Sequence, residues 1–453
     1  MTGVLLLLAA PRAYADGDGL VRQEVSFRGG GGLVLHGTVL GKDGAPGREP
    51  GIVLVGGSGA GPREEYRQEA EAFARAGITT LVYDKRTVGY SFLHRDFGLL
   101  ADDALAGVRL LRSRSGVDPR QVGLWGFSEG GWVAPLAASR SADVAFVVTI
   151  GGSGYDPLRT QTYYLATHLH HQGVDEPFRR TVAGPAAQLM AATGLFPAAG
   201  YDPLPVLERL QRTPVLALWG DHDTQVPPRE SARIFREALA RAGNQHVVIG
   251  FVAGGAHNGH RTSDGFDRIG GPLFHGKNLG ELTPRYAQTM TSWVRAVAAG
   301  HPPASSAAPA PGQALATTPV PSHPWYAWLA PALLLLGFAA YPTSALLRRG
   351  PVLRPVRWLA GLGILAVVTT VACSTAVFAA GNGAAAPVVW GRPALWLVVQ
   401  ALAVAVVVSA CVSAAALRRR RLTPSRATWL RLAPVGLAAA GFVPWAVWWG
   451  VAA

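Results

Sequence analysis

The residues best suited to chemistry surround Ser128, which follows a short apolar run and stands between two glycines in Gly126-Phe127-Ser128-Glu129-Gly130. This spacing is typical of a nucleophile elbow, in which a strand ends, a helix begins, and the serine Oγ projects from the strained turn between them. Glycines suit the flanking positions because a side chain there would collide with neighbouring backbone. The pattern predicts a nucleophilic serine at position 128.

A serine hydroxyl is a weak nucleophile, so it requires a histidine base and an acid that orients the histidine. Two later loops supply candidates. An apolar run ending at Trp219 leads into Asp221-His222-Asp223, and a run ending at Phe251 leads into His257-Asn258-Gly259-His260. In a parallel sheet both loops open at the same edge as the elbow. The first loop therefore offers two acids, and the second offers two histidines.

The elements that must position these residues alternate between strand and helix. Apolar runs bounded by turn residues predict strands at 21–27, 33–40, 52–55, 78–83, 122–126, 146–150, 215–219 and 246–251. Helical patterns lie at 62–76, 102–113, 227–242 and 284–299. The first two strands resemble a hairpin. The later alternation predicts a mostly parallel sheet that helices cover on both faces.

The motifs together resemble the α/β-hydrolase superfamily, and within it the bacterial carboxylesterases of the dienelactone hydrolase and prolyl-oligopeptidase-like group. The resemblance covers roughly Val21 to Ala299. It rests on four stretches: Val55-Gly56-Gly57-Ser58-Gly59, Tyr83-Asp84-Lys85-Arg86 with Val88-Gly89-Tyr90-Ser91, Gly126-Phe127-Ser128-Glu129-Gly130-Gly131-Trp132, and Gly220, His222 and Asp223 with Val226-Pro227. It implies an α/β-hydrolase fold.

By this resemblance Ser128 is the nucleophile, Asp223 the acid and His257 the base. Asp221 is the alternative acid, although an aspartate at that place can instead bond the backbone of its own turn. His260 is the alternative base. The chain departs from the family pattern at Thr87, usually glycine, and at Phe127, usually histidine, and neither change touches the three catalytic positions.

An oxyanion formed during acyl transfer needs two backbone donors. The residue after the nucleophile and the loop after an earlier strand supply them in this fold. The expected donors are the N–H groups of Glu129 and Ser58. The glycines around Ser58 lack the lysine of a phosphate-binding loop, which argues against a nucleotide site. The charged run Asp84-Lys85-Arg86 favours a structural ion-pair network, with a substrate clamp as the alternative.

Between Gly151 and Arg212 the alternation stops, and the length of this segment predicts a small helical cap over the domain. It contains the histidines His168, His170 and His171. Their clustering raises the alternative of a zinc site. However, no carboxylate or cysteine stands at ligand spacing, so a solvated helix face is the better interpretation. We expect neither a metal nor a cofactor.

The composition of the last third separates it from the rest of the chain. All charged residues after Trp325 are arginines, eleven in number, and they lie between apolar runs. The sequence pI near 10.3 therefore does not indicate a nucleic-acid binder. Each of the four runs is long enough to cross a hydrocarbon core. They span 325–347, 358–380, 394–417 and 432–451. Both cysteines, Cys373 and Cys411, fall inside them, so no disulfide is expected in the remainder.

The arginines predict an orientation. Ten of them lie in the loops after the first and third runs, and only Arg392 lies in the loop after the second. Positive loops stay in the cytoplasm, so the α/β domain is expected outside the membrane. The apolar run Val4 to Ala10, followed by Ala13-Tyr14-Ala15, agrees with this as an export signal that is cleaved or uncleaved, although it lacks a basic start.

The predicted organisation has four parts: residues 1–20 as an export signal or apolar tail, 21–300 as the α/β-hydrolase domain with a cap at about 151–212, 301–324 as a Pro/Ala-rich linker, and 325–453 as four membrane helices. The expected function is a membrane-anchored serine hydrolase, and most simply a carboxylesterase acting on a small ester or acyl substrate. An acyltransferase or a peptidase on the same fold is the alternative. A transporter or sensor with a non-catalytic outer domain belongs to a different class, and the spans lack the acidic residues that ion pathways usually show.

Overall fold

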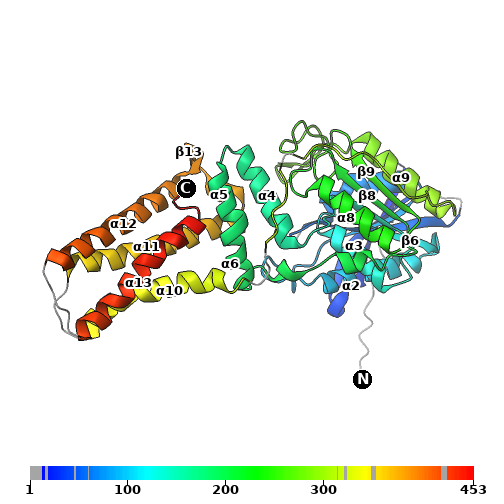
Figure 1. Cartoon of the computed structure of the whole chain (residues 1–453). Coiled ribbons are helices and arrows are strands. Elements are labelled where there is room, and N and C mark those ends of the chain that lie inside the picture. Colours follow the sequence, from blue (N-terminus) through cyan, green and yellow to red (C-terminus); the bar gives the residue numbers. More distant parts are fainter. Residues whose placement is uncertain are drawn as a thin grey trace, which may run out of the picture. The chain divides into compact units, whose positions relative to one another are not determined.

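The computed structural model describes residues 13–15, 19–44, 47–59, 61–313, 315–320, 324–347, 353–419 and 426–452 (Figure 1). Contacts divide the chain into two compact units. The first combines Met1–Thr160 with Gly200–Ala316, and the second combines Gln161–Ala199 with Thr317–Ala453.

The first unit is built on a ten-stranded sheet with the order β1-β2-β3-β5-β4-β6-β7-β8-β9-β12. The strands on the antiparallel side are β1 (Ala13–Ala15), β2 (Leu20–Arg28), β3 (Val34–Lys42) and β5 (Thr79–Tyr83). The strands that follow are β4 (Glu49–Val55), β6 (Val117–Phe127), β7 (Val147–Ile150), β8 (Val215–Gly220), β9 (Val247–Val252) and β12 (Ser306–Ala307). From β5 to β12 every neighbouring pair is parallel. The predicted mostly parallel sheet, beginning with a hairpin, is confirmed.

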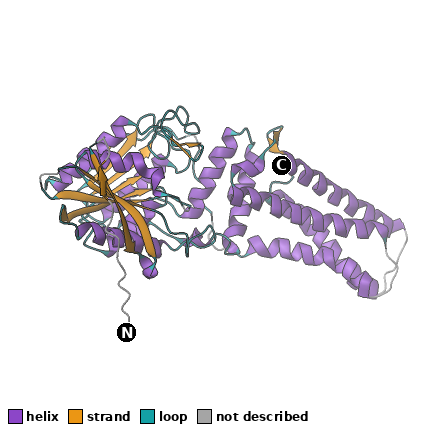
Figure 2. Cartoon of the chain, turned by 180° about the vertical axis from the view of Figure 1, so that it is seen from behind, coloured by secondary structure: helices purple, strands orange, loops and turns teal. Residues whose placement is uncertain are grey.

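Helices cover both faces of this sheet (Figure 2). They are α1 (Arg67–Arg75), α2 (Phe97–Arg112), α3 (Gly130–Arg140), α7 (Leu204–Leu207), α8 (Pro228–Arg241) and α9 (Pro284–Ala298). Helix α2 begins five residues before the predicted start because the carboxylate of Asp96 accepts a hydrogen bond from the N–H of Leu99 at 3.1 Å. Such an N-cap satisfies one of the free donors of the first turn.

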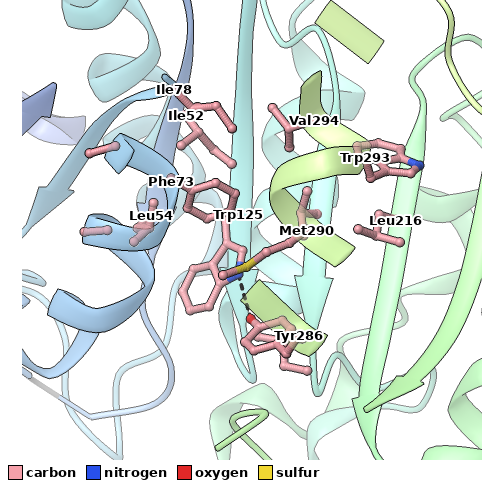
Figure 3. Packing of buried hydrophobic residues seen from close by; sticks show 14 of the residues in the cluster. Ile52, Leu54, Phe73, Ile78, Trp125, Leu216, Tyr286, Met290, Trp293 and Val294 are labelled. Carbon is pink, nitrogen blue, oxygen red and sulfur yellow. Dashed lines mark hydrogen bonds between the residues drawn. The ribbon is translucent and has the colours of Figure 1, made fainter. Parts of the chain in front are cut away.

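The core between α1, α9 and the sheet is aromatic and aliphatic (Figure 3). Trp125 on β6 is 1% exposed, and its indole N–H donates to the hydroxyl of Tyr286 on α9 at 3.0 Å. Phe73 and Met290, both fully buried, fill the space beside it. Because Ser128 directly follows the last residue of β6, this packing fixes the strand that presents the serine.

Both edges of the sheet differ from the predicted organisation. Residues Ser306–Ala307 of the linker form β12 and pair with Val248 and Ile249, so the first part of the linker belongs to the sheet. An edge strand accepts this pairing because its backbone groups are free. At the other edge, Ala13–Ala15 form β1 and pair with β2. The apolar run Val4 to Ala10 of the expected export signal lies outside the described residues.

The second unit holds four long apolar helices, each long and apolar enough to cross a membrane. They are α10 (Tyr326–Leu347), α11 (Arg354–Ala380), α12 (Ala394–Arg419) and α13 (Arg426–Trp448). The predicted four-helix region is confirmed at the level of helix length and composition. Arg348, Arg349, Arg420 and Arg421 lie outside the described residues.

The same unit includes most of the segment predicted as a cap. This segment contains α4 (Pro157–His171), α5 (Glu176–Thr181), a π-helical turn (Val182–Ala186) and α6 (Ala187–Ala192). The prediction assigned all of 151–212 to the hydrolase domain. In the structure, residues 161–199 instead pack with the four long helices, because apolar and aromatic side chains of the segment are buried against the helix ends.

Candidate active site

Ser128 lies on the turn between β6, which ends at Phe127, and α3, which begins at Gly130. Its φ is 53°, in the left-handed region. A non-glycine residue in this region costs on the order of 1–3 kcal/mol and persists only where the surroundings enforce it. Here the N–H of Ser128 is held by the carbonyl of Ile150 on β7 at 3.0 Å. The turn has the strained backbone expected of a nucleophile elbow.

The flanking glycines are required by close backbone approach. A Cβ on Gly126 would lie 2.1 Å from the carbonyl oxygen of Gly130, and a Cβ on Gly130 would lie 2.3 Å from that of Val55. Both contacts are with backbone, which cannot move aside as a flexible side chain can. The Gly-x-Ser-x-Gly spacing therefore follows from the geometry of the turn.

His257 and Asp223 form a buried pair. The Nδ1 atom of His257 lies 2.9 Å from Oδ2 of Asp223. The other carboxylate oxygen, Oδ1, accepts hydrogen bonds from the N–H groups of Gln225 and Val226, each at 2.9 Å. Asp223 is therefore fixed in one orientation. A carboxylate at Nδ1 places the proton there and leaves Nε2 as a hydrogen-bond acceptor.

The free nitrogen of His257 has no partner among the described residues. Its Nε2 atom is buried and makes no hydrogen bond to them. Buried polar atoms are rarely left unpaired, and such an atom requires an explanation. A nitrogen that receives a proton from a substrate-attacking hydroxyl would have this property.

The imidazole lies beside the elbow. Its ring centroid is 5.0 Å from that of Phe127, the residue before the serine. A Cβ on Gly151, whose φ is 62°, would lie 2.6 Å from Cε1 of His257. Gly151 directly follows Ile150, which holds the Ser128 N–H. The structure thus brings the serine turn and the His257–Asp223 pair together at the end of β7.

The alternative acid and base have other partners. A carboxylate oxygen of Asp221 accepts from the N–H of Gly255 at 3.2 Å, so it bonds the backbone of the loop that carries His257 and not, as anticipated, that of its own turn. His260 is buried, with Nε2 2.8 Å from a carboxylate oxygen of Glu69 and Nδ1 2.8 Å from the carbonyl oxygen of Leu279. Burial alone would lower the pKa of His260, but the charge and hydrogen bond of Glu69 outweigh it and raise that pKa. None of these partners belongs to the elbow, so Asp223 and His257 remain the candidates.

The glycine loop after β4 lies against the elbow. A Cβ on Gly57 would lie 2.9 Å from the ring of Phe127 and 3.4 Å from Cβ of Ser128. The N–H of Gly57 donates to the hydroxyl of Tyr66 at 2.8 Å, and the N–H of Gly59 donates to the hydroxyl of Tyr90 at 2.9 Å. Ser58 stands between these two anchored glycines. A cavity of about 250 Å³ adjoins the loop and is lined by Ser58, Gly59, Tyr66 and Lys85 among others.

The charged run after β5 forms the structural network that the sequence favoured. Asp84 pairs with Arg63 at 2.9 Å. Arg86 binds Asp103 through two hydrogen bonds of 2.6 and 2.7 Å. Lys85 forms an ion pair with Glu129. Burial lowers the pKa of Lys85, and the Glu129 carboxylate only partly opposes this.

The sequence did not predict a role for the side chain of Glu129. Glu129 was expected to contribute only its backbone N–H, yet its side chain is 1% exposed and lies at the centre of several contacts. A signal was present in the sequence. An acidic residue directly after the nucleophile lies in a buried turn, and buried carboxylates require partners. Lys85 follows β5, which is separated from β6 by one strand of the same sheet.

The cap histidines provide no metal cluster. Among the residues that the structure describes, no group of three or more His, Cys, Asp or Glu could hold an ion. His168 instead lies with Nδ1 2.9 Å from the carbonyl oxygen of Tyr164 and its ring against that of Tyr164.

Comparison with known proteins finds similarity to one family and to several individual proteins. The prolyl oligopeptidase family matches residues 98–269. A thiohydrolase from Arthrinium phaeospermum is 33% identical over 132 residues, which cover 28% of this chain and 42% of that protein. A polyketide transferase from Penicillium crustosum is 25% identical over 293 residues, which cover 54% of this chain and 94% of that protein. A dienelactone hydrolase structure from Anabaena variabilis aligns with 20% identity and a TM-score of 0.35, covering 63% of this chain and 97% of that one.

The matched region runs from α2 through the elbow and the Asp223 turn to just beyond His257. The sheet order, the left-handed serine and the buried His–Asp pair lie in or beside it. The chain therefore has a domain with the α/β-hydrolase fold, which is similar to the prolyl oligopeptidase family over residues 98–269, together with four helices long and apolar enough to span a membrane.

Proposed function

We propose that the chain is a serine hydrolase that cleaves acyl substrates through a covalent acyl-enzyme. The observation that carries this proposal is the buried, unpartnered Nε2 of His257, which is oriented by Asp223 and lies beside the strained Ser128 turn. In this mechanism Ser128 Oγ attacks the substrate carbonyl while His257 Nε2 takes its proton. His257 then gives the proton to the leaving group.

The second half of the cycle reverses these roles. Water attacks the acyl-enzyme, His257 again takes a proton, and the acid leaves as Ser128 regains its own. Asp223 holds the imidazole and stabilises its protonated form without itself changing protonation. The N–H groups of Ser58 and Glu129 are proposed to bind the oxyanion, since neither donates a hydrogen bond to another described residue.

Carboxylic esters are the substrates we propose first, and thioesters belong to the same acyl chemistry. The names of two relatives support this wider class, because one is a thiohydrolase and another a polyketide transferase. Transfer differs from hydrolysis only in the acceptor, which is an alcohol or similar nucleophile in place of water. A peptidase would use the same residues on an amide.

The purified full chain, kept in detergent, should hydrolyse short-chain nitrophenyl esters or matched acyl thioesters faster than peptide anilides. Ser128→Ala should lower kcat by at least about 10³-fold, because the nucleophile is lost. Ser139→Ala is the matched control, since among the described residues its hydroxyl bonds only the carbonyl of Leu136. Retained ester hydrolysis in Ser128→Ala would contradict the proposal. Product analysis with an added alcohol measures the share of transfer.

We further propose that the four long helices anchor the protein in a membrane with the catalytic domain outside. The arginine distribution supports this orientation, since Arg392 is the one charged residue in the described loop between α11 and α12. The described ends on the opposite side carry Arg354, Arg357 and Arg418 among others.

Cysteine labelling in intact cells tests the orientation. In a chain whose two native cysteines are replaced by alanine, Ala384→Cys should react with a membrane-impermeant maleimide from outside. Ser425→Cys should react only after the cells are opened. The reverse pattern would show that the catalytic domain faces the cytoplasm.

A further inference from the structure

The carboxylate of Glu129 connects the elbow to the glycine loop. It is paired with Lys85 and accepts a hydrogen bond from the hydroxyl of Tyr90 at 2.8 Å. Arg95 approaches its other oxygen at 3.4 Å. A carboxylate buried to this degree stays in place only when cations and donors surround it. The two partners that touch one of its oxygens, Lys85 and Tyr90, also touch the loop.

Lys85 controls the direction of one peptide unit. Its Nζ donates to the carbonyl oxygen of Gly57 at 2.5 Å. That carbonyl and the N–H of Ser58 belong to the same planar trans peptide, in which they point in opposite directions. Holding the carbonyl therefore aims the N–H of Ser58. A cation on the carbonyl also polarises the amide and makes its N–H a stronger donor.

Tyr90 fixes the far side of the same residue. Its hydroxyl accepts from the N–H of Gly59 at 2.9 Å and donates to Glu129. Lys85 Nζ lies 3.2 Å from this hydroxyl and 4.3 Å from the centre of the ring. The peptide units before and after Ser58 are thus both anchored to one carboxylate.

The second expected donor is fixed by the elbow itself. The carbonyl of Ser128 accepts from the N–H of Gly131 at 2.8 Å. Because this carbonyl shares a peptide unit with the N–H of Glu129, that N–H points the other way. Glu129 therefore carries one donor on its backbone and, through its side chain, holds the loop that carries the other.

We propose that Lys85, Tyr90 and Glu129 form a positioning network that aims the N–H of Ser58 at the oxyanion. The network acts through the loop and does not touch the reacting atoms, so these are positioning residues. This inference rests on the acyl-transfer function proposed for Ser128. It extends that function by assigning the buried charges beneath the loop a role in transition-state stabilisation.

Tyr90→Phe is the first test because it removes only a hydroxyl. Loss of a whole oxyanion donor lowers kcat roughly 10²- to 10³-fold, and a misaimed donor should cost less, about 10- to 100-fold. KM should stay within about threefold. The inhibition constant of an alkyl boronic acid, whose adduct with Ser128 mimics the tetrahedral state, should weaken by the same factor as kcat/KM.

Tyr201→Phe is the matched control for that variant. The hydroxyl of Tyr201 is buried and has no hydrogen-bond partner among the described residues, and its ring packs on Phe97 and Trp132. Tyr201→Phe should leave kcat and the affinity for the boronic acid unchanged. Unchanged kcat in Tyr90→Phe, or equal losses in the two variants, would overturn the positioning network.

A series of variants that remove the buried charges separates the positioning role from an effect on stability. Lys85→Met should lower both Tm and kcat, since it leaves the Glu129 carboxylate without its principal cation. In the double variant Lys85→Met with Glu129→Met, the buried carboxylate is removed together with its principal cation, so Tm should rise above that of Lys85→Met. The Gly57 carbonyl is still unanchored, and kcat should stay low. Recovery of kcat together with Tm would mean that the ion pair is only structural.

The outcomes also distinguish this inference from the proposed function. If Ser128→Ala keeps its activity, the acyl-transfer function fails whatever the network does. If Ser128→Ala is inactive and Tyr90→Phe has normal kcat, only the positioning network fails. If the variants that remove the buried charges yield no folded protein, Tyr90→Phe alone tests the positioning network.

Discussion

Replacing Asp223 by asparagine is expected to lower kcat about 10⁴-fold while leaving the fold intact. An asparagine oxygen can still accept from the N–H groups of Gln225 and Val226, which Asp223 now binds. Its amide then faces His257 with a donor. That donor stabilises the wrong imidazole tautomer, with the proton on Nε2, so the ring no longer accepts the serine proton. Steady-state kinetics and thermal unfolding of the full chain measure the two effects.

Asp221→Asn is the control for this variant. Asp221 stands in the same turn, but its carboxylate bonds the N–H of Gly255 and lies 3.8 Å from His222. We expect kcat to change by no more than a few-fold. A larger loss in Asp221→Asn than in Asp223→Asn would move the acid to position 221.

Phe178→Ala is expected to loosen residues 161–199 strongly, although this segment lies outside the long apolar helices. Phe178 is 1% exposed, and its ring packs on that of Trp396 at a centroid distance of 4.8 Å. Removing a buried phenylalanine side chain costs about 3–5 kcal/mol. If this loss lowers the free energy of local unfolding of the segment, proteolysis within the segment should accelerate by about 100-fold or more. Limited proteolysis of the full chain in detergent, followed by fragment mapping, measures it.

Arg180→Ala is the matched control on the same helix. Its side chain is 76% exposed and, within the described part of the chain, pairs only with Glu176, four residues earlier. Such surface pairs contribute about 0.3–0.5 kcal/mol. Cleavage of this variant should match that of the unmodified chain. Equal rates for all three proteins would show that the segment does not depend on the helices.

The contacts of this segment change the interpretation of the four helices. Thr181 donates from its hydroxyl to the carbonyl of Trp449 at 2.8 Å, and the N–H of Asp175 donates to the carbonyl of Gly391 at 2.7 Å. A Cβ on Gly391 would lie 2.2 Å from the Asp175 carboxylate. The helix ends thus form a fitted surface for the inserted segment. Besides any anchoring role, the four helices hold part of the chain that interrupts the hydrolase domain.

Much of the fold could be predicted from the sequence because its signals are local. Alternating apolar runs and helical patterns identified the parallel sheet, and the glycines around Ser128 identified the elbow whose φ is 53°. Length and hydropathy identified the four long helices. These features depend on residues close together in the chain.

The remainder depends on contacts between distant residues. Asp221 and Asp223 stand on one turn, and only the direction of each side chain pairs the second with His257. The docking of residues 161–199 joins Thr181 to Trp449, across more than half of the chain, and no local pattern encodes it. The pairing of Glu129 with Lys85 likewise joins loops that follow different strands. Such contacts require the folded backbone.

Mass spectrometry of the full chain after reaction with a fluorophosphonate tests the central claim most directly. The reagent forms a stable bond only with a serine that is activated as a nucleophile. We predict one adduct per chain, located on the peptide that contains Ser128 and absent in Ser128→Ala. An adduct on a different serine, or undiminished labelling of Ser128→Ala, would contradict the assignment of Ser128 as the nucleophile.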